Sequence, residues 1–520
     1  MGEQSRISDA ASESALVAFS LFGGQVLATF VAGISSIILA RILGPEGYGR
    51  YSLAPTVAGL LMLGTGFGTT AALTREVSRA VAQGGSRSAA QLVGVVLRFN
   101  LLASLGAAAV GFALAEQLSQ ALLNRPDLAP LARLMLPLVI VDTLFNVASA
   151  ALLGLGDARA LALLPVARDA VRSVASPLLA LRFGCEGALA GFVAGHAAAA
   201  ALGVAMLKAR FRELRAAPWG ELRPLLRYGL PLYTSVALST SLATYQNSII
   251  AWVATDEEVG NLKVAANFVA LLQLVSFPIS SALFPAFSRM EKGEAERAFR
   301  YAVKYSSLVL VPAGAFTIVA ARDLVRLVYG GAYALAPAYL SLNAVSLLWS
   351  GLGSAVLASF FQGIGETRVL FVVTLTNAAL FVPLSAALAP WLGVFGVIIA
   401  TLLSNLASTL YGLREAVKRD ASIDWRTAVL VCASALSAAA VVVVLGHLRA
   451  HYILRLAASA AAFLAAYGAL LPLTGCLERA DLESLEAAFS REPLRTLARP
   501  VLKLESVLLR AAENLLHKTL

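Results

Sequence analysis

Long runs of apolar residues, separated by short polar segments, recur along almost the whole chain. Runs of about 20 apolar residues span the hydrocarbon core of a bilayer as α-helices. The pattern therefore predicts an all-α polytopic membrane protein and excludes a transmembrane β-barrel, whose strands alternate in much shorter runs. The fourteen predicted helices cover residues 15–40, 51–73, 91–115, 131–153, 159–181, 185–207, 228–254, 263–287, 303–321, 335–361, 368–389, 391–413, 427–447 and 452–474.

The distribution of positive charge predicts the orientation of these helices. With the N-terminus inside, the inner connections and tails hold 29 of the 41 Lys and Arg residues, and the outer connections hold 10. Because Lys and Arg accumulate in cytoplasmic connections, both termini are expected in the cytoplasm and the protein in the cell membrane. Basic cytoplasmic loops also explain the net charge of +10, so no nucleic-acid partner is expected.

The two ends of the chain differ in character. The apolar run that follows the polar residues 1–14 is too long for a signal-peptide core and lacks a cleavage site, so it is predicted to be a retained first helix. In the tail, residues 475–520, apolar residues recur at three- and four-residue spacing with charges between them. This spacing predicts an amphipathic helix on the inner membrane surface, and the alternative is a loosely ordered tail.

An internal repeat organises the chain. GLGDARAL at 154–161 recurs as GIGETRVL at 363–370, shifted by 209, and the turn 184–188 recurs at 393–397 with the same shift. Residues 45–61 match 256–272 at a shift of 211. Each copy holds six helices, so both enter the membrane in the same direction, as in transporters whose two lobes surround a central site. The alternative is a duplicated scaffold without a role in transport.

The repeat predicts the domain organisation. Two helices and a tail follow the second copy, and a basic segment joins the copies on the cytoplasmic side. The expected parts are an N-terminal six-helix lobe (1–207), a cytoplasmic linker (208–227), a C-terminal six-helix lobe (228–413), extra helices 13 and 14 (427–474) and the amphipathic cytoplasmic tail (475–520).

Composition adds few signs of enzyme chemistry. Hydrophobic residues make up 58% of the 520 residues and charged residues 14%, with a mean hydropathy of +0.77. The three cysteines are far apart, and Walker A and HExxH motifs are missing. We therefore expect no disulfide framework, no metal, no cofactor and no ATPase activity. A membrane enzyme of glycan assembly needs acidic residues on a substantial outer loop, and the predicted outer loops are short.

The predicted helix 159–181 carries charges near its middle. The second copy of the repeat is uncharged there, with Asn377 at the position of Arg168, so the charged segment is also predicted to span the membrane. A charge in mid-membrane costs about 3 kcal/mol, so the residues should face a wet cavity or a partner. The alternatives are a structural Arg168–Asp169 pair at a helix seam, or an Arg168 that snorkels inward. The polar stripe on this helix consists of Arg168, Asp169, Arg172, Ser173 and Ser176.

Other polar residues in the predicted helices are candidates for the same cavity. Arg98 lies within the third helix, where it either faces the cavity or snorkels to the cytoplasmic surface. His196 is interpreted as a packing residue rather than a proton relay. Helices 1, 7 and 8 have polar faces that line a cavity or hydrogen-bond between helices. The cavity candidates on these three helices are Gln25, Thr29, Tyr245, Gln246, Asn247 and Asn267.

Several loop and turn motifs resemble one transporter family. The chain is similar, over about residues 10–420, to polysaccharide-transport flippases of the Wzx type, within the multidrug/oligosaccharidyl-lipid/polysaccharide exporter superfamily. Many members carry a charged pair late in helix 7, where this chain has Gln246 and Asn247. The motifs that carry the resemblance are ARILGPEGYGRYSLA, EEVGNLKVAANFVALL, LFPAFSRM, VYGGAYALA and FQGIGETRVL.

The resemblance implies a fold and a function. It implies two six-helix lobes around a V-shaped cavity, and movement of a polyprenyl-linked oligosaccharide from the cytoplasmic to the outer leaflet. Arg172, Arg168 and Arg98 would then attract the phosphate, because the guanidinium fork donates paired hydrogen bonds. Expected partners are this lipid-linked substrate, membrane lipids and enzymes of glycan assembly. The alternatives are an exporter of small molecules coupled to an H⁺ or Na⁺ gradient and, from another class, a membrane enzyme of glycan assembly.

Overall fold

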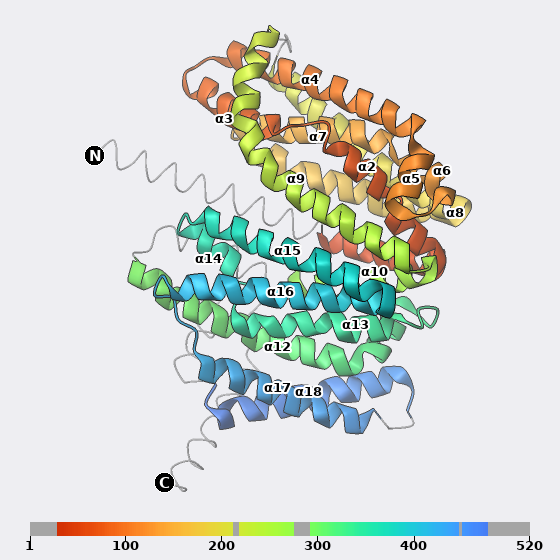
Figure 1. Cartoon of the computed structure of the whole chain (residues 1–520), viewed down its shortest axis with the longest axis vertical. Coiled ribbons are helices and arrows are strands. Elements are labelled where there is room, and N and C mark those ends of the chain that lie inside the picture. The colour runs from red at the N-terminus through yellow and green to blue at the C-terminus, as the bar shows by residue number, and fades with distance from the viewer. Residues whose placement is uncertain (1–28, 212–217, 275–291, 447–449, 477–520) are drawn as a thin grey trace. The chain divides into compact units, whose positions relative to one another are not determined.

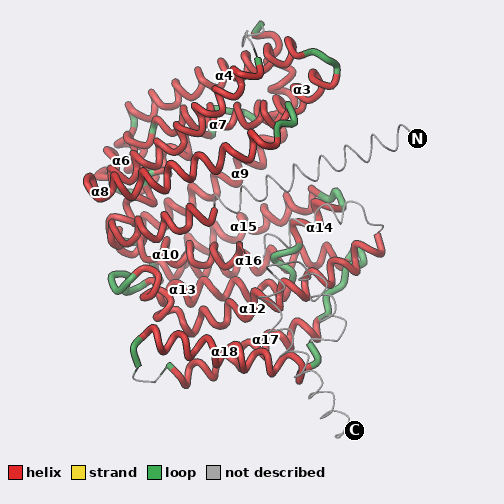
Figure 2. Tube along the Cα trace, turned by 180° about the vertical axis from the view of Figure 1, so that it is seen from behind, coloured by secondary structure: helices red, strands yellow, loops and turns green. Residues whose placement is uncertain are grey.

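The described part of the chain is built from helices. The computed structural model describes residues 29–211, 218–274, 292–446 and 450–476, and within these ranges it contains helices and loops without strands (Figures 1 and 2). The predicted tail helix, apart from its first two residues, lies outside the described residues. The chain divides into two compact units, of which unit 1 holds residues 1–264 and 389–397, and unit 2 holds residues 265–388 and 398–520.

Unit 1 is a bundle around an aliphatic core. Its core joins buried side chains of α3, α4, α7, α8 and α9, among them Leu73, Val96 and Leu164. Its elements are the helical residues 29–53, α2 (Pro55–Met62), α3 (Thr69–Ala82), α4 (Ser86–Ala113), α5 (Ala115–Leu123), η1 (Pro126–Leu128), α6 (Ala129–Met135), α7 (Pro137–Gly154), α8 (Ala158–Arg210), η2 (Trp219–Glu221), α9 (Leu222–Val253) and the first half of α10 (Asp256–Gln273).

Unit 2 contains the later helices. The helices α17 and α18 pack against each other and against α12, through a core that includes Val311, Val431 and Phe463, so they lie beside α12 (Figures 1 and 2). The elements from α12 onward are α12 (Lys292–Tyr329), α13 (Ala336–Ala344), η4 (Val345–Leu352), α14 (Leu357–Gly363), α15 (Thr367–Leu392), α16 (Val394–Val417), α17 (Trp425–Leu445) and α18 (Tyr452–Thr474).

Two predicted helices are broken in the structure. The predicted helix 51–73 is interrupted between α2 and α3, where Phe67 and Gly68 both have positive φ angles. The predicted helix 335–361 is divided into α13, η4 and α14, with a bend of 42°. Gly353, with φ +84°, ends η4, because glycine adopts this conformation without a Cβ penalty. The apolar runs predicted these segments, but the breaks depend on positive φ angles at a few residues inside them.

Helix lengths and surface chemistry fit a multi-pass membrane protein. Among the described residues, nine helices are long and apolar enough to cross a membrane, and ten if the bent pair counts as one span. The number fourteen is not confirmed, partly because α8 holds two predicted helices in one continuous element. Many large apolar side chains are exposed, such as Phe112, Leu181 and Trp391. Soluble monomers rarely expose apolar surface on this scale, so lipid is the natural solvent of these faces.

The structure supports the predicted repeat at its turns. Gly156 and Gly365, 209 residues apart, have φ angles of +71° and +78°. The acidic residue that follows each glycine forms an ion pair with an arginine 53 residues later. Asp157 pairs with Arg210, and Glu366 pairs with Arg419. Each unit thus repeats a turn and an ion pair that ties the start of one helix to the end of the next. The predicted domain boundaries stay a prediction, because the two compact units divide the chain at other positions.

Candidate substrate site

The charged stripe lies in the first half of α8. Gly184, with φ +57° and ψ −135°, breaks this element into two helices that fold back on each other. Gly191 and Gly195, on the second half, face the backbone of the first half. A Cβ on Gly195 would lie 2.7 Å from the carbonyl oxygen of Arg168 and 2.7 Å from Cβ of Arg172. Glycine at this position therefore allows the close approach that fixes where the two arginines lie.

Arg168, Asp169 and Arg172 form one ionic cluster. Arg168 donates from Nε and Nη2 to the two carboxylate oxygens of Asp169, at 3.2 and 3.1 Å. Arg172 Nη2 lies 3.5 Å from Asp169 Oδ1. The Asp169 side chain is 4% exposed, whereas those of Arg168 and Arg172 are 24% and 22% exposed. One buried carboxylate thus holds two partly accessible guanidinium groups.

Aromatic rings complete the cluster. The guanidinium of Arg168 lies 5.6 Å from the ring centre of Phe145, and that of Arg172 lies 5.3 Å from the ring centre of Phe192. Phe192 in turn stacks on His196 at 4.7 Å. His196 Nδ1 lies 3.0 Å from the Phe192 carbonyl oxygen, within one helical turn. The rings attract the cations electrostatically and limit their motion.

A carboxylate that sequence analysis missed lies next to this cluster. Asp142, on α7, accepts a hydrogen bond of 2.7 Å from Asn146 one turn later. Both residues line a cavity of 430 Å³ in unit 1, together with Asn100, Tyr233 and Thr240. Arg168 and Arg172 are not among the described residues that line it. Asp142 is the single acid in an apolar run, which was the signal available from the sequence.

The positions of the second copy that correspond to the cluster are neutral. In unit 2, Asn377 Nδ2 donates to Asn405 Oδ1 at 2.7 Å. These residues match Arg168 and His196 at a shift of 209. Asn405 lines a cavity of 370 Å³ with Gln273, Ser346 and Ser408 among its walls. The same position therefore carries an ionic cluster in one copy and an amide pair in the other.

The remaining predicted arginine lies elsewhere. Arg98 is exposed and lies over the ring of Trp219, 5.7 Å from its centre. Trp219 lies within the predicted cytoplasmic linker, residues 208–227. Among the described residues, no ion pair or ring contact joins Arg98 to Arg168 or Arg172. This placement matches the snorkelling alternative.

The other polar candidates are placed as follows. Asn247 accepts a hydrogen bond of 3.0 Å from Lys263 Nζ, a lysine that sequence analysis did not single out. Thr29, Tyr245, Gln246 and Asn267 are partly buried, and Gln25 lies outside the described residues.

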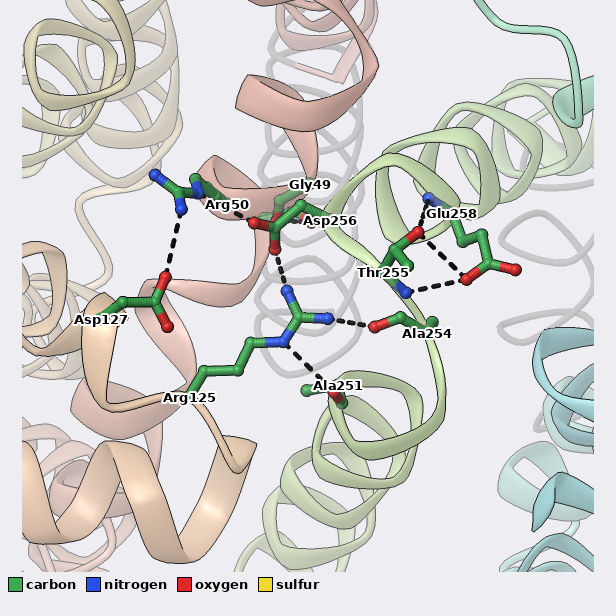
Figure 3. A network of polar contacts seen from close by, with 10 residues as sticks. Gly49, Arg50, Arg125, Asp127, Ala251, Ala254, Thr255, Asp256 and Glu258 are labelled. Atoms are coloured by element: carbon green, nitrogen blue, oxygen red, sulfur yellow. Dashed lines mark hydrogen bonds and ion pairs between the residues drawn. The ribbon is translucent and has the colours of Figure 1, made fainter.

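Three predicted outer connections meet in a second ionic network within unit 1 (Figure 3). Asp256, at the start of α10, accepts hydrogen bonds from Arg50 Nε at 2.9 Å and from Arg125 Nη1. Arg50 also donates to Asp127, at 3.1 Å. The network joins residue 50, the α5–η1 turn and the α9–α10 turn. These segments are far apart in the sequence, and their contact was not predicted from it.

Arg125 is the central cation of this network. It donates to the carbonyl oxygens of Ala251 and Ala254, at the end of α9, where helical carbonyls lack intrahelical partners (Figure 3). Burial lowers the pKa of the Arg125 guanidinium, and the neighbouring Asp127 counteracts this effect. An arginine pKa lies so far above neutrality that the group stays charged. Arg125 therefore stabilises the α9–α10 turn both as a cation and as a hydrogen-bond donor.

Two glycines bring the backbones of this network into contact. A Cβ on Gly49 would lie 1.9 Å from the carbonyl oxygen of Asp256, and a Cβ on Gly260 would lie 1.9 Å from that of Pro45. Pro45 and Asp256, like Gly49 and Gly260, are 211 residues apart. The two copies of the repeat therefore make a reciprocal contact through the same turn, which excludes any side chain at either glycine.

Comparisons with known proteins agree with this architecture. Residues 17–291 match the family model described as "Polysaccharide biosynthesis protein". No curated protein matches the chain.

Solved structures of similar fold cover most of the chain. An inward closed structure of the lipid II flippase MurJ is similar over 88% of this chain and 99% of its own, at 14% identity and a TM-score of 0.72. An inward-facing MATE-family multidrug resistance transporter covers 75% of this chain and 94% of its own, at 18% identity and a TM-score of 0.63. A transporter of the MOP superfamily from Pyrococcus furiosus covers 78% of this chain and 95% of its own, at 20% identity and a TM-score of 0.54.

Proposed function

The chain belongs to the polysaccharide biosynthesis protein family, and from this premise we propose that it is a flippase for a polyprenyl-linked oligosaccharide. The substrate, joined through phosphate or diphosphate, moves from the cytoplasmic to the outer leaflet by alternating access and serves assembly of surface polysaccharide or glycoprotein. The protein is a multi-pass membrane protein with the fold of MOP-superfamily transporters. We place it in the cell membrane with both termini in the cytoplasm, and we consider it a transporter rather than an enzyme.

The observation that carries this proposal is the cluster on α8. Two guanidinium groups share one buried carboxylate, so with Asp169 ionised these three residues carry one net positive charge. Asp169 occupies Nε and Nη2 of Arg168, and leaves other donors of both arginines available. A partly accessible arginine inside a membrane span suits a phosphate, which accepts paired hydrogen bonds from a guanidinium. The polyprenyl tail stays in the bilayer, so only the polar part needs a hydrated path.

Cells that depend on this protein for surface glycan provide the test. Arg172→Ala removes one guanidinium, so we expect surface glycan to fall about tenfold or more at normal protein level, as for one lost charge-assisted hydrogen bond. Arg182→Ala is the matched control, because Arg182 also lies on α8 and over an aromatic ring, but is exposed at the predicted outer end. Normal glycan export by the Arg172→Ala variant would show that Arg172 does not have the proposed role in binding the substrate phosphate.

One observation favours a second candidate, the cation-coupled exporter of small molecules. Asp142 lines the unit 1 cavity, and an acid in that position can hold H⁺ or Na⁺. The two candidates are separated by measuring both activities of Asp142→Asn. If drug efflux is present in the wild type and lost in the variant while surface glycan is unchanged, the exporter is favoured. If glycan export alone is lost, the flippase is favoured and Asp142 belongs to its coupling.

A further inference from the structure

A basic pocket lies in unit 2, whereas the α8 cluster belongs to unit 1. It has a volume of 330 Å³ and is formed where α12 ends and the chain turns toward α13. Arg322 and Arg326, one helical turn apart, line it together with Gly330, Gly331 and Tyr333. The predicted topology places this turn at the outer face of the membrane.

Within the described part of the chain, no acidic side chain pairs with the two arginines of the pocket. Asp323, between the two arginines, is bound on both carboxylate oxygens by Arg455 of α18, with Nε at 2.7 Å from Oδ2. Arg322 and Arg326 have no ion-pair partner among the described residues. Two cations one turn apart repel each other and are disfavoured in outer connections, so an external anion would stabilise them.

Neighbouring groups hold one of these arginines in place. The guanidinium of Arg326 lies over the ring of Tyr452, 4.7 Å from its centre, and Tyr452 is the first residue of α18. The Asp323–Arg455 pair fixes the same two helices to each other. Gly330 has φ +90°, and a Cβ at Gly330 or Gly331 would meet no atom within 4 Å, so the turn beside the arginines is open. The result is a concave surface with two forked donors.

The surroundings indicate an amphipathic ligand. Val325, Ala334 and Pro337 also line the pocket. Leu327 and Leu335, each next in sequence to a lining residue, are 41% and 38% exposed, so apolar side chains both line the pocket and are exposed in the same turn. A volume of 330 Å³ is at the small end of ligand pockets, which range over about 300–1,000 Å³, and suits a headgroup rather than an oligosaccharide. Basic pockets between membrane helices bind anionic headgroups at the cytoplasmic side of membranes, and the same charge pairing applies to a headgroup in the outer leaflet.

We infer that this pocket binds the phosphate of a lipid, with Arg322 and Arg326 as its donors and the acyl or polyprenyl chain against the apolar side chains of the same turn. The phosphate has two possible sources, an anionic phospholipid of the membrane or a polyprenyl phosphate. The inference does not rest on the proposed function, because a transporter of any substrate would hold such a lipid equally well.

Native mass spectrometry of the purified full-length protein tests the inference. The probes are phosphatidylglycerol, phosphatidylcholine and a polyprenyl monophosphate. For Arg322→Gln combined with Arg326→Gln, we expect the Kd of at least one anionic lipid to rise about tenfold or more. Arg133→Gln combined with Arg182→Gln is the matched control, because both residues are exposed arginines over aromatic rings and the same charge is removed. Its Kd values should equal those of the wild type.

A third variant separates binding from folding. Arg322→Lys with Arg326→Lys keeps both charges but loses the fork, so its Kd should lie between those of wild type and the glutamine variant. A selective effect on phosphatidylglycerol assigns the pocket to membrane phospholipid, and a selective effect on polyprenyl phosphate assigns it to the carrier. The inference is overturned if the glutamine variant binds as the wild type does, if the control loses binding equally, or if the wild type binds neither anionic lipid more tightly than phosphatidylcholine.

Discussion

At the residue scale, Asp169 reconciles two interpretations of the charged stripe. From the sequence, a structural Arg168–Asp169 pair and a cationic cavity wall are alternatives. In the structure Asp169 is buried and paired, while both arginines keep about a fifth of their side-chain surface exposed. The arginines can therefore pair with Asp169 through some of their N–H groups and offer the remaining N–H groups to a ligand.

Asp169→Asn tests the structural half of this account. The substitution leaves two guanidinium groups without their shared anion, so we expect the variant to lose on the order of 2 kcal/mol, less than the roughly 3–5 kcal/mol of a fully buried pair because the arginines are partly exposed. Thermal unfolding in detergent measures the loss. Arg168→Gln combined with Asp169→Asn should be more stable than Asp169→Asn alone. A double variant that is less stable than both single variants would contradict the pairing.

Gly195→Ala tests how the arginines are positioned. The new Cβ would meet the carbonyl oxygen of Arg168 and the backbone of Arg172, so the two halves of α8 must separate. We expect a lower melting temperature and reduced glycan export. Gly106→Ala is the control, since Gly106 lies in α4 with no atom within 4 Å of an added Cβ. That change should be neutral or slightly stabilising, because alanine favours helix.

Charged residues of the site can be predicted from the sequence only where several of them recur at helical spacing. The stripe around Arg168 stood out because three charges interrupt one apolar run at helical spacing. Asp142 and Lys263 are single charges, and a single charge gives no spacing from which a partner can be inferred. The residues that hold them, Asn146 one turn away and Asn247 on the preceding helix, are visible only after folding.

At the element scale, the Asp256 network connects three parts of unit 1 through ion pairs that differ in burial. The Asp256 side chain is 14% exposed and bound by two arginines, whereas Asp127 is 54% exposed and bound by one. No local pattern predicts that Arg125 meets Asp256, because the pairing spans 131 residues. The turn glycines that surround it were predictable from the repeat, but their reciprocal contact was not.

Asp256→Asn tests this difference. It weakens two ion pairs, so we expect a loss of about 1–2 kcal/mol in thermal unfolding, whereas Asp127→Asn should change stability by less than about 1 kcal/mol, as exposed pairs do. Equal melting temperatures for the two variants would contradict the central position of Asp256.

The start of α17 gives a pH dependence. Asp424 accepts hydrogen bonds from the backbone N–H and the hydroxyl of Thr427, which lowers the pKa of its carboxyl. Its stabilising effect is therefore present above the unfolded pKa of about 3.9 and is lost as pH falls through the folded value. Asp424→Ala should cost about 1 kcal/mol at neutral pH. The melting-temperature difference from wild type should shrink below about pH 4, and a difference that grows on acidification would refute the assignment.

At the scale of the whole molecule, the repeat explains both the similarity and the asymmetry of the two copies. The turns at Gly156 and Gly365 and the pairs Asp157–Arg210 and Glu366–Arg419 are equivalent. The chemistry differs inside the helices, where Asn377 replaces Arg168. The sequence predicted this asymmetry because aligned copies show substitutions directly. It did not predict the broken helices at residues 63–68 and 345–356, because the glycines there lie within otherwise apolar runs long enough to span a membrane.

Transport by the purified protein tests the central claim most directly. The full-length protein, reconstituted into liposomes with a fluorescent polyprenyl-diphosphate oligosaccharide, should move the lipid between leaflets, with and without imposed proton or sodium gradients. Arg172→Ala should slow this movement about tenfold or more, whereas Arg182→Ala should not change it. The account is contradicted if wild type and Arg172→Ala move the lipid-linked oligosaccharide at the same rate.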